Sequence, residues 1–130
     1  MYRGTNLILD ALPTCEEFNK FCSQFPTETK QATVNHMQGS FATSFGIALN
    51  KRLSNQVLAF VVSSPSRALE IETDLETLVG RESFVTYPQR EQLPQVGRDP
   101  DHQITGLQIE CLETILTGKT RLLVTTIRAL

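Results

Sequence analysis

The residues best suited to chemistry lie in one short stretch, HMQGSFAT (36–43), between a β-like run and a helix-like run. A phosphate-binding loop occupies such a strand–turn–helix junction and reads GxxxxGK[ST]. Its glycines let backbone N–H groups approach the phosphates, its lysine neutralises their charge, and its hydroxyl binds magnesium. The stretch therefore raises the question of whether this chain binds or hydrolyses a nucleotide.

Compared position by position, the stretch lacks most of the groups that a phosphate-binding loop needs. His36 stands at the first glycine, Phe41 at the second and Ala42 at the lysine. Because phosphoryl transfer depends on charge and positioning, we expect no ATP hydrolysis here. Weak anion binding at the start of the following helix stays open, since free N–H groups persist there. What remains of a vestigial phosphate loop is Gly39, Ser40 and Thr43.

The other reactive side chains show no catalytic or metal-binding pattern. His36 and His102 have no cysteine or carboxylate at a metal-ligand spacing, so we expect no metal site, no cofactor and no catalytic residue. The serines after the apolar run 57–62 lack the GxSxG context of a nucleophile, which favours a helix-capping role. Three cysteines without a CxxC pair favour buried free thiols in a reduced, cytoplasmic setting.

The first thirty residues predict an N-terminal helical segment (1–30). Thr14 and Glu17 have the spacing of a capping box, and Pro26 would end the helix that follows. Its apolar stripe has helical spacing, which predicts a packed face: Phe18, Phe21, Cys22 and Phe25.

From residue 31 onward, β-like and helical patterns alternate. Strands are expected in QATVNHM (31–37), VLAFVV (57–62), SFVTY (83–87) and RLLVTT (121–126). Helices are expected after the Gly-Ser turn, from Pro65 to Gly80 and from Ile104 to Gly118. VLAFVV is apolar at successive positions, the pattern of a parallel strand covered on both sides. The order predicts an α/β fold with a three-layer open parallel sheet and helices on both faces.

Composition disfavours several classes of function, although a local basic patch stays open within a balanced total charge. The chain has 130 residues, 20% charged residues and a formal net charge of -2, so it shows no basic surplus for gripping nucleic acid or an anionic membrane. Its longest apolar run is too short to span a bilayer. The mixed-charge stretch QREQLP (89–94) is the best candidate for a contact surface outside the sheet.

Three segments together resemble a known family. MQGSFATSFGIAL (37–49) resembles its Leu-x-Gly-Ser segment, YPQREQLP (87–94) its aromatic-Pro-x-x-Glu-x-Leu-Pro run, and GLQIECLETILTGKTRLLVTTIRAL (106–130) its helix followed by Val-Val-Thr-Pro-x-Arg-Ala-Leu. The family is the amino-terminal, UvrB-like subdomain of bacterial transcription-repair coupling factor (Mfd). Thr126 stands where proline is common in that family, which is a departure from its pattern.

The resemblance implies a P-loop-NTPase (RecA-like) fold with a degenerate phosphate loop, in a UvrB-like subdomain (31–130) of a longer protein. It implies a non-catalytic scaffold in an ATP-dependent DNA translocase that couples transcription to nucleotide excision repair. In the parent protein, ATP and magnesium would serve downstream motor domains, and UvrA, RNA polymerase and double-stranded DNA would be partners. This subdomain would mainly contact neighbouring subdomains, with no membrane.

Two other classes of function compete with this interpretation. A stand-alone nucleotide- or anion-binding α/β domain is the main alternative. A response-regulator-like module is disfavoured, because neither the strand at 31–37 nor the strand at 83–87 ends in the acidic residues that such a module needs.

Overall fold

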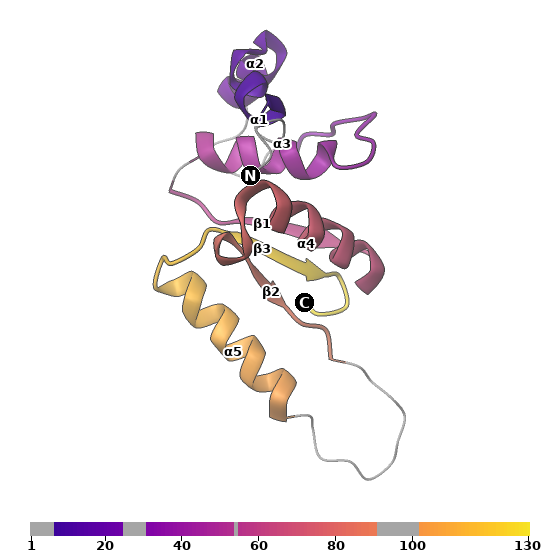
Figure 1. Ribbon diagram of the computed structural model, residues 1–130, viewed down its shortest axis with the longest axis vertical. Helices are drawn as coiled ribbons and strands as arrows, with labels where there is room; N and C mark the ends of the chain where they lie inside the picture. Colours follow the sequence, from indigo (N-terminus) through magenta and orange to yellow (C-terminus); the bar gives the residue numbers. More distant parts are fainter. Residues whose placement is uncertain (1–6, 25–30, 54, 91–101) are drawn as a thin grey trace. The chain divides into compact units, whose positions relative to one another are not determined.

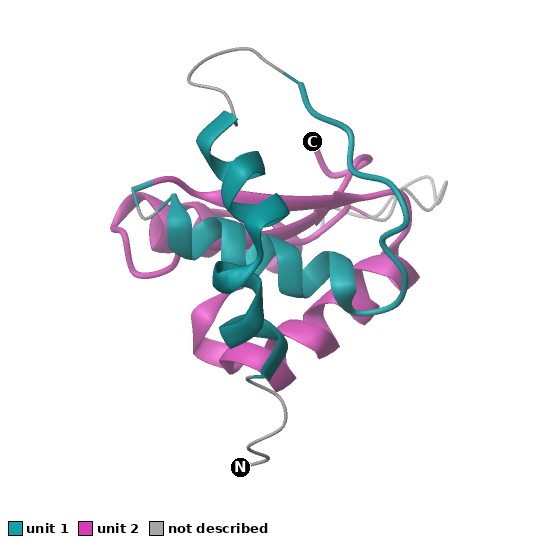
Figure 2. Cartoon of the chain, turned by 90° about the horizontal axis from the view of Figure 1, so that it is seen from above, with its two compact units in different colours: residues 1–55 teal, residues 56–130 magenta. Residues whose placement is uncertain are grey.

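The computed structural model describes residues 7–24, 31–53, 55–90 and 102–130. Two compact units, residues 1–55 and 56–130, divide the chain (Figure 2). The third helix of the chain, which follows the Gly-Ser turn, belongs to the first unit. The sequence-based division into a helical segment (1–30) and an α/β subdomain (31–130) stays a prediction.

The regular elements described in the first unit are all helical. It contains α1 (Leu7–Ala11), a 3-10 turn η1 (Leu12–Thr14), α2 (Glu16–Gln24) and α3 (Phe41–Arg52). Rings from two helices meet edge to face, with centroids 5.5 Å apart for Phe18 and Phe45 and 5.4 Å apart for Phe21 and Phe45. The aromatic stripe that the sequence predicts lies on α2 and is therefore a packing face, although its last member, Phe25, lies outside the described residues.

The capping box predicted at Thr14 and Glu17 is wrong. Pro13 lies in the 3-10 turn, which takes in Thr14, and the Thr14 hydroxyl donates to the Ala11 carbonyl at 2.6 Å. α2 begins one residue later, and Cys15 donates its thiol to the Glu17 carboxylate at 3.1 Å. The Thr14 hydroxyl is thus hydrogen-bonded within the preceding turn, where it does not cap α2.

The strand expected at residues 31–37 does not form. Residues 31–38 have no regular secondary structure, and His36 adopts a positive φ of 62° that breaks an extended run. A strand is stable only when its backbone groups pair in a ladder, and no strand of the described residues pairs with this segment. The helix predicted after the Gly-Ser turn is confirmed as α3.

The second unit contains the sheet. Its elements are β1 (Leu58–Val62), α4 (Pro65–Val79), a 3-10 turn η2 (Arg81–Ser83), β2 (Val85–Tyr87), α5 (His102–Leu116) and β3 (Leu122–Thr126). All pairs are parallel, and the strand order in the described residues is β1-β3-β2 (Figure 1). The α/β class and the parallel sheet predicted from the sequence are confirmed.

Local signals explain where α4 begins and ends. The Ser64 hydroxyl accepts a hydrogen bond from the backbone N–H of Arg67 at 3.3 Å, and Pro65 occupies the first turn. Gly80 ends the helix with a φ of 92°, a conformation that suits glycine. Its N–H reaches the carbonyls of Leu75 and Glu76, so both predicted helix ends are confirmed.

The core of the second unit lies between α4 and the sheet. Leu75 and Val124 are fully buried. A hydrogen bond also joins the sheet to α4, because the Thr86 hydroxyl of β2 donates to the Glu72 carboxylate of α4 at 3.0 Å. α5 packs against β2 instead (Figure 1). The two-sided cover predicted for residues 57–62 is wrong, because Ala59 and Val61 are exposed.

Candidate functional site

The turn before α3 is built as a small backbone loop. Gly39 has a φ of 57°, and the N–H of Phe41 donates to the Gln38 carbonyl at 3.2 Å. α3 then begins at Phe41, with Ser40 as its N-cap residue, and the Ser40 hydroxyl makes no capping hydrogen bond. Gly39 and Ser40 are exposed. The amino end of a helix is therefore present at the turn, without the strand that precedes it in a phosphate-binding loop.

Thr43 stands at the position whose hydroxyl binds magnesium in a phosphate-binding loop, but its side chain does not lie at the surface. Thr43 has 0% of its surface exposed. The neighbouring Ser44 is also buried and donates its hydroxyl to the Ser40 carbonyl at 3.1 Å. No lysine or arginine occurs between residues 31 and 50 to neutralise a phosphate from this segment. The turn keeps the small residues of a phosphate loop but not its charge.

The carboxyl ends of parallel strands are where ligands bind in open α/β sheets. Here, hydrogen bonds among residues at the ends of the strands join that edge of the sheet. The Thr126 hydroxyl donates to the Gln89 side-chain oxygen at 2.8 Å, and the Thr125 hydroxyl donates to the Tyr87 carbonyl at 3.1 Å. The buried Gln108 of α5 donates its amide to the Pro88 carbonyl at 2.8 Å.

Sequence reasoning did not identify these threonine and glutamine side chains. The only signal was that β3 ends in two threonines after an apolar run. Their partners are 20 to 38 residues away in sequence, so no spacing pattern could have found them. They join the ends of β2 and β3 to each other and to α5, and each donates one hydrogen bond within the fold.

The predicted contact stretch at residues 89–94 lies mostly outside the described residues. Gln89 and Arg90 are its described members, and a guanidinium nitrogen of Arg90 donates to the Thr105 hydroxyl at 3.3 Å. Both residues are therefore held against their own unit. Its role as a contact surface stays a prediction.

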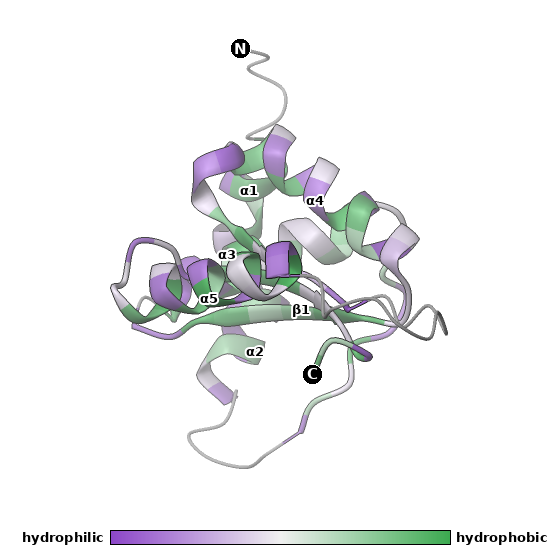
Figure 3. Cartoon of the chain, turned by 90° about the horizontal axis from the view of Figure 1, so that it is seen from below, coloured by the Kyte–Doolittle hydropathy of each residue, from purple (hydrophilic) through white to green (hydrophobic). Residues whose placement is uncertain are grey.

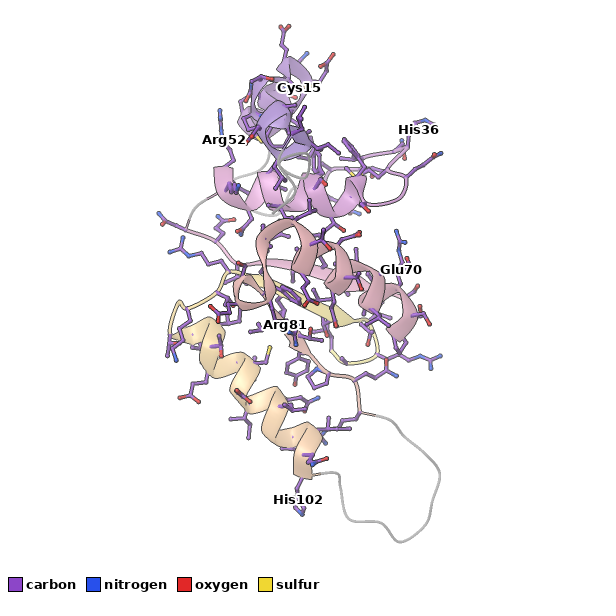
Figure 4. All side chains as sticks on the ribbon, viewed as in Figure 1. Cys15, His36, Arg52, Glu70, Arg81 and His102 are labelled. Carbon is purple, nitrogen blue, oxygen red and sulfur yellow. The ribbon has the colours of Figure 1, made fainter. Side chains whose placement is uncertain are left out.

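The described histidines and serines are not arranged as a catalytic triad. His36 lies in the segment before α3 and His102 in the first turn of α5, and both are exposed (Figure 4). Ser64 caps α4, as the sequence predicted. Among the residues that the structure describes, no group of three or more His, Cys, Asp or Glu side chains could hold a metal ion.

The three cysteines are free thiols. Burial raises the pKa of Cys111 and of Cys22, and in Cys22 the charge of Arg52 opposes this effect. A raised pKa makes a thiol a poorer nucleophile near neutral pH. The Cys15 thiol, by donating its hydrogen bond, lowers the pKa of the Glu17 carboxyl.

Two carboxylates of α4, those of Glu70 and Glu72, have partners within their own unit. Glu70 forms an ion pair with Arg67 one turn earlier, and Glu72 accepts the hydrogen bond from Thr86. The exposed ion pair contributes little to stability, whereas the second bond links α4 to β2. Neither carboxylate is left in an arrangement that resembles a general acid or base.

The chain matches no protein-family model, no curated protein and no solved structure at a significant level. Within the described part of the chain, no helix combines the length and apolarity that crossing a membrane requires.

Proposed function

We propose that this chain is a non-catalytic scaffold subdomain of an ATP-dependent DNA translocase, at the amino-terminal, UvrB-like position of a transcription-repair coupling factor. In this proposal the fold is a P-loop-NTPase (RecA-like) fold whose phosphate loop is degenerate. ATP and magnesium act in motor domains elsewhere in the parent protein. UvrA, RNA polymerase and double-stranded DNA are partners of that cytoplasmic parent, and this subdomain mainly positions its neighbours.

The observation that carries the non-catalytic part is the state of the turn before α3. A functional phosphate loop needs a lysine, close backbone approach and an accessible hydroxyl. This turn has Ala42 at the lysine position, the Phe41 side chain at the second glycine, and a fully buried Thr43. The parallel order of β1, β3 and β2 supports the fold class on which the family assignment rests.

A stand-alone anion-binding domain is the second candidate, and one observation favours it. Gly39 and Ser40 are exposed at the amino end of α3, a helix of 12 residues. A helix N-terminus attracts negative charge through its unpaired N–H groups and its dipole. That attraction does not require the missing lysine.

Titration calorimetry on the full chain separates the two candidates. The probe is ATP with magnesium, and the matched variant Ala42→Lys restores the consensus lysine. We expect no heat of binding for the wild-type chain at micromolar nucleotide, because charge neutralisation is absent. Micromolar binding by the wild-type chain would refute the degenerate-loop proposal and support the anion-binding domain.

A separate observation tests the family. The gene downstream of the codon for Leu130 should encode a UvrA-binding subdomain and, much later, a complete GxxxxGK[ST] loop with helicase motifs. A gene without them would make the coupling-factor assignment wrong, whatever the calorimetry gives.

A further inference from the structure

The helix α5 is held to the rest of its unit by a small buried surface. Among its 15 residues, the buried ones are Gln108 and Cys111. The other long helix, α4, also has 15 residues, and it buries Ala68, Ile71 and Leu75. Burial of apolar surface is the main source of docking energy between a helix and a sheet. α5 is therefore attached to the sheet less strongly than α4.

The large apolar side chains of α5 add little to this attachment. Several of them are exposed (Figure 3): Leu107, Ile109, Leu112 and Leu116. Successive residues of a helix are about 100° apart, so Leu107 and Ile109 lie on nearly opposite sides. The apolar residues of α5 are thus spread around the helix, whereas a firmly docked helix has one apolar stripe against its sheet.

Two side-chain hydrogen bonds join α5 to the end of β2. The Gln108 amide donates to the Pro88 carbonyl at 2.8 Å, and the Arg90 guanidinium donates to the Thr105 hydroxyl at 3.3 Å. Arg90 is exposed, so water competes for its bond, whereas Gln108 is buried. The bond from Gln108 is therefore the stronger of these two polar links.

The sequence of α5, HQITGLQIECLETIL, favours a helix only weakly. Its isoleucines and threonines are β-branched, and Gly106 lies inside the helix, so its intrinsic helix propensity is low. Even alanine-rich helices of about 12–15 residues are only marginally stable in water when isolated. We infer that α5 depends on its contacts with β2 to stay helical.

The connectivity allows α5 to leave the sheet without breaking it. α5 lies between β2 and β3 in the chain, and these two strands pair directly with each other (Figure 1). The bond from the Thr125 hydroxyl to the Tyr87 carbonyl also joins them without α5. The buried Leu75 and Val124 lie in the core between α4 and the sheet. An element whose departure spares the strand pairs and the core can open at a lower free energy than global unfolding requires.

We propose that α5 is a detachable helix. It leaves β2 and unfolds as one unit, while the sheet and α4 stay folded, and this opening exposes the Cys111 thiol to solvent. Access to Cys111 is then controlled by the docking of α5 and not by the stability of the whole chain. The inference does not rest on the family resemblance or on the phosphate loop.

The test follows the labelling of Cys111 in the full chain by a small maleimide, at reagent concentrations where the rate is proportional to the reagent. Mass spectrometry of the digested protein separates Cys111 from the other cysteines. The ratio of its rate in the folded chain to its rate in urea-unfolded chain gives the opening constant. Urea unfolding followed by circular dichroism gives the global unfolding constant and its urea slope.

Three variants separate local opening from global unfolding. Gln108→Ala removes the buried bond to Pro88 while placing the best helix former in α5, so faster labelling reports lost docking. Gly106→Ala strengthens the helix at a position where an added Cβ meets open space. Ser64→Ala is the control, because it removes the cap of α4 and leaves α5 unchanged.

We expect the opening constant of the wild-type chain to exceed the global unfolding constant by about tenfold or more, with a smaller urea slope. Gln108→Ala should speed labelling of Cys111 about fivefold, and Gly106→Ala should slow it about threefold. Ser64→Ala should raise the global unfolding constant about fivefold and leave labelling within about twofold of wild type.

Three results would overturn the proposal. The first is an opening constant and urea slope equal to the global values. The second is an acceleration by Ser64→Ala as large as that by Gln108→Ala, since Cys111 would then react only through global unfolding. The third is a rate that neither urea nor the α5 variants change, because the thiol would then be accessible without opening. If circular dichroism shows that Gln108→Ala does not fold, the slowing by Gly106→Ala decides.

Discussion

The core between α4 and the sheet can be tested by a pair of identical substitutions on one helix. Leu75 has 0% of its surface exposed and Leu69 has 63%. Replacing either by alanine changes the local helix propensity by the same small amount, so the difference isolates burial. Leu75→Ala removes buried carbons worth about 0.8 kcal/mol each and leaves a cavity in the core between α4 and the sheet. We expect it to lower the free energy of unfolding by about 3 kcal/mol.

Urea unfolding followed by circular dichroism at the helix band measures both variants. Leu69→Ala should change the unfolding free energy by about 0.5 kcal/mol or less. The slope of each unfolding curve must match the wild-type slope, so that the midpoints report stability alone. A loss below about 1 kcal/mol for Leu75→Ala, or equal losses for both, would refute the assignment of this core.

Three further predictions concern caps, glycines and thiols. Ser64→Ala should destabilise the chain by about 1 kcal/mol in urea unfolding, because it removes the N-cap acceptor of α4. Gly80→Ala should destabilise, since Gly80 has a φ of 92°, whereas Gly106→Ala in α5 should stabilise by about 0.5–1 kcal/mol, since a Cβ there meets open space. A thiol reagent at pH 8 should modify Cys15 well before Cys111, whose burial raises its pKa, and mass spectrometry of the digested protein reports the order. Equal modification rates for the two thiols, or stability changes of the same sign for the two glycine variants, would contradict these assignments.

Local patterns predicted the elements that have both a strong apolar rhythm and clear end signals. α4 is the clearest case, because a serine cap, a proline and a terminal glycine mark its ends. The apolar residues of α4 do not all face inward. Leu69 lies six residues before the buried Leu75, which is not a helix-face spacing, and it points away from the core.

The errors arose where a local pattern depends on a distant partner. Residues 31–37 contain Thr33 and Val34, which favour strands, yet a strand also needs a ladder partner that the sequence does not reveal. The capping box failed because the turn containing Pro13 uses the Thr14 hydroxyl. The bond between Gln108 and Pro88 depends on how α5 packs against β2, which no spacing along the chain encodes.

The aromatic residues of α3 add a reason for preferring a scaffold over an anion-binding site. Phe45 packs edge to face with Phe18 and Phe21 of α2, and the Phe41 ring lies 6.5 Å from it, centroid to centroid. Such pairs add stability beyond the burial of their area. The first turns of α3 therefore contribute to an aromatic cluster, and Phe41 adds a bulky ring where a phosphate loop has glycine. Restoring a lysine at Ala42 would supply charge but leave that ring in place, so we expect Ala42→Lys to raise nucleotide affinity far less than Ala42→Lys combined with Phe41→Gly.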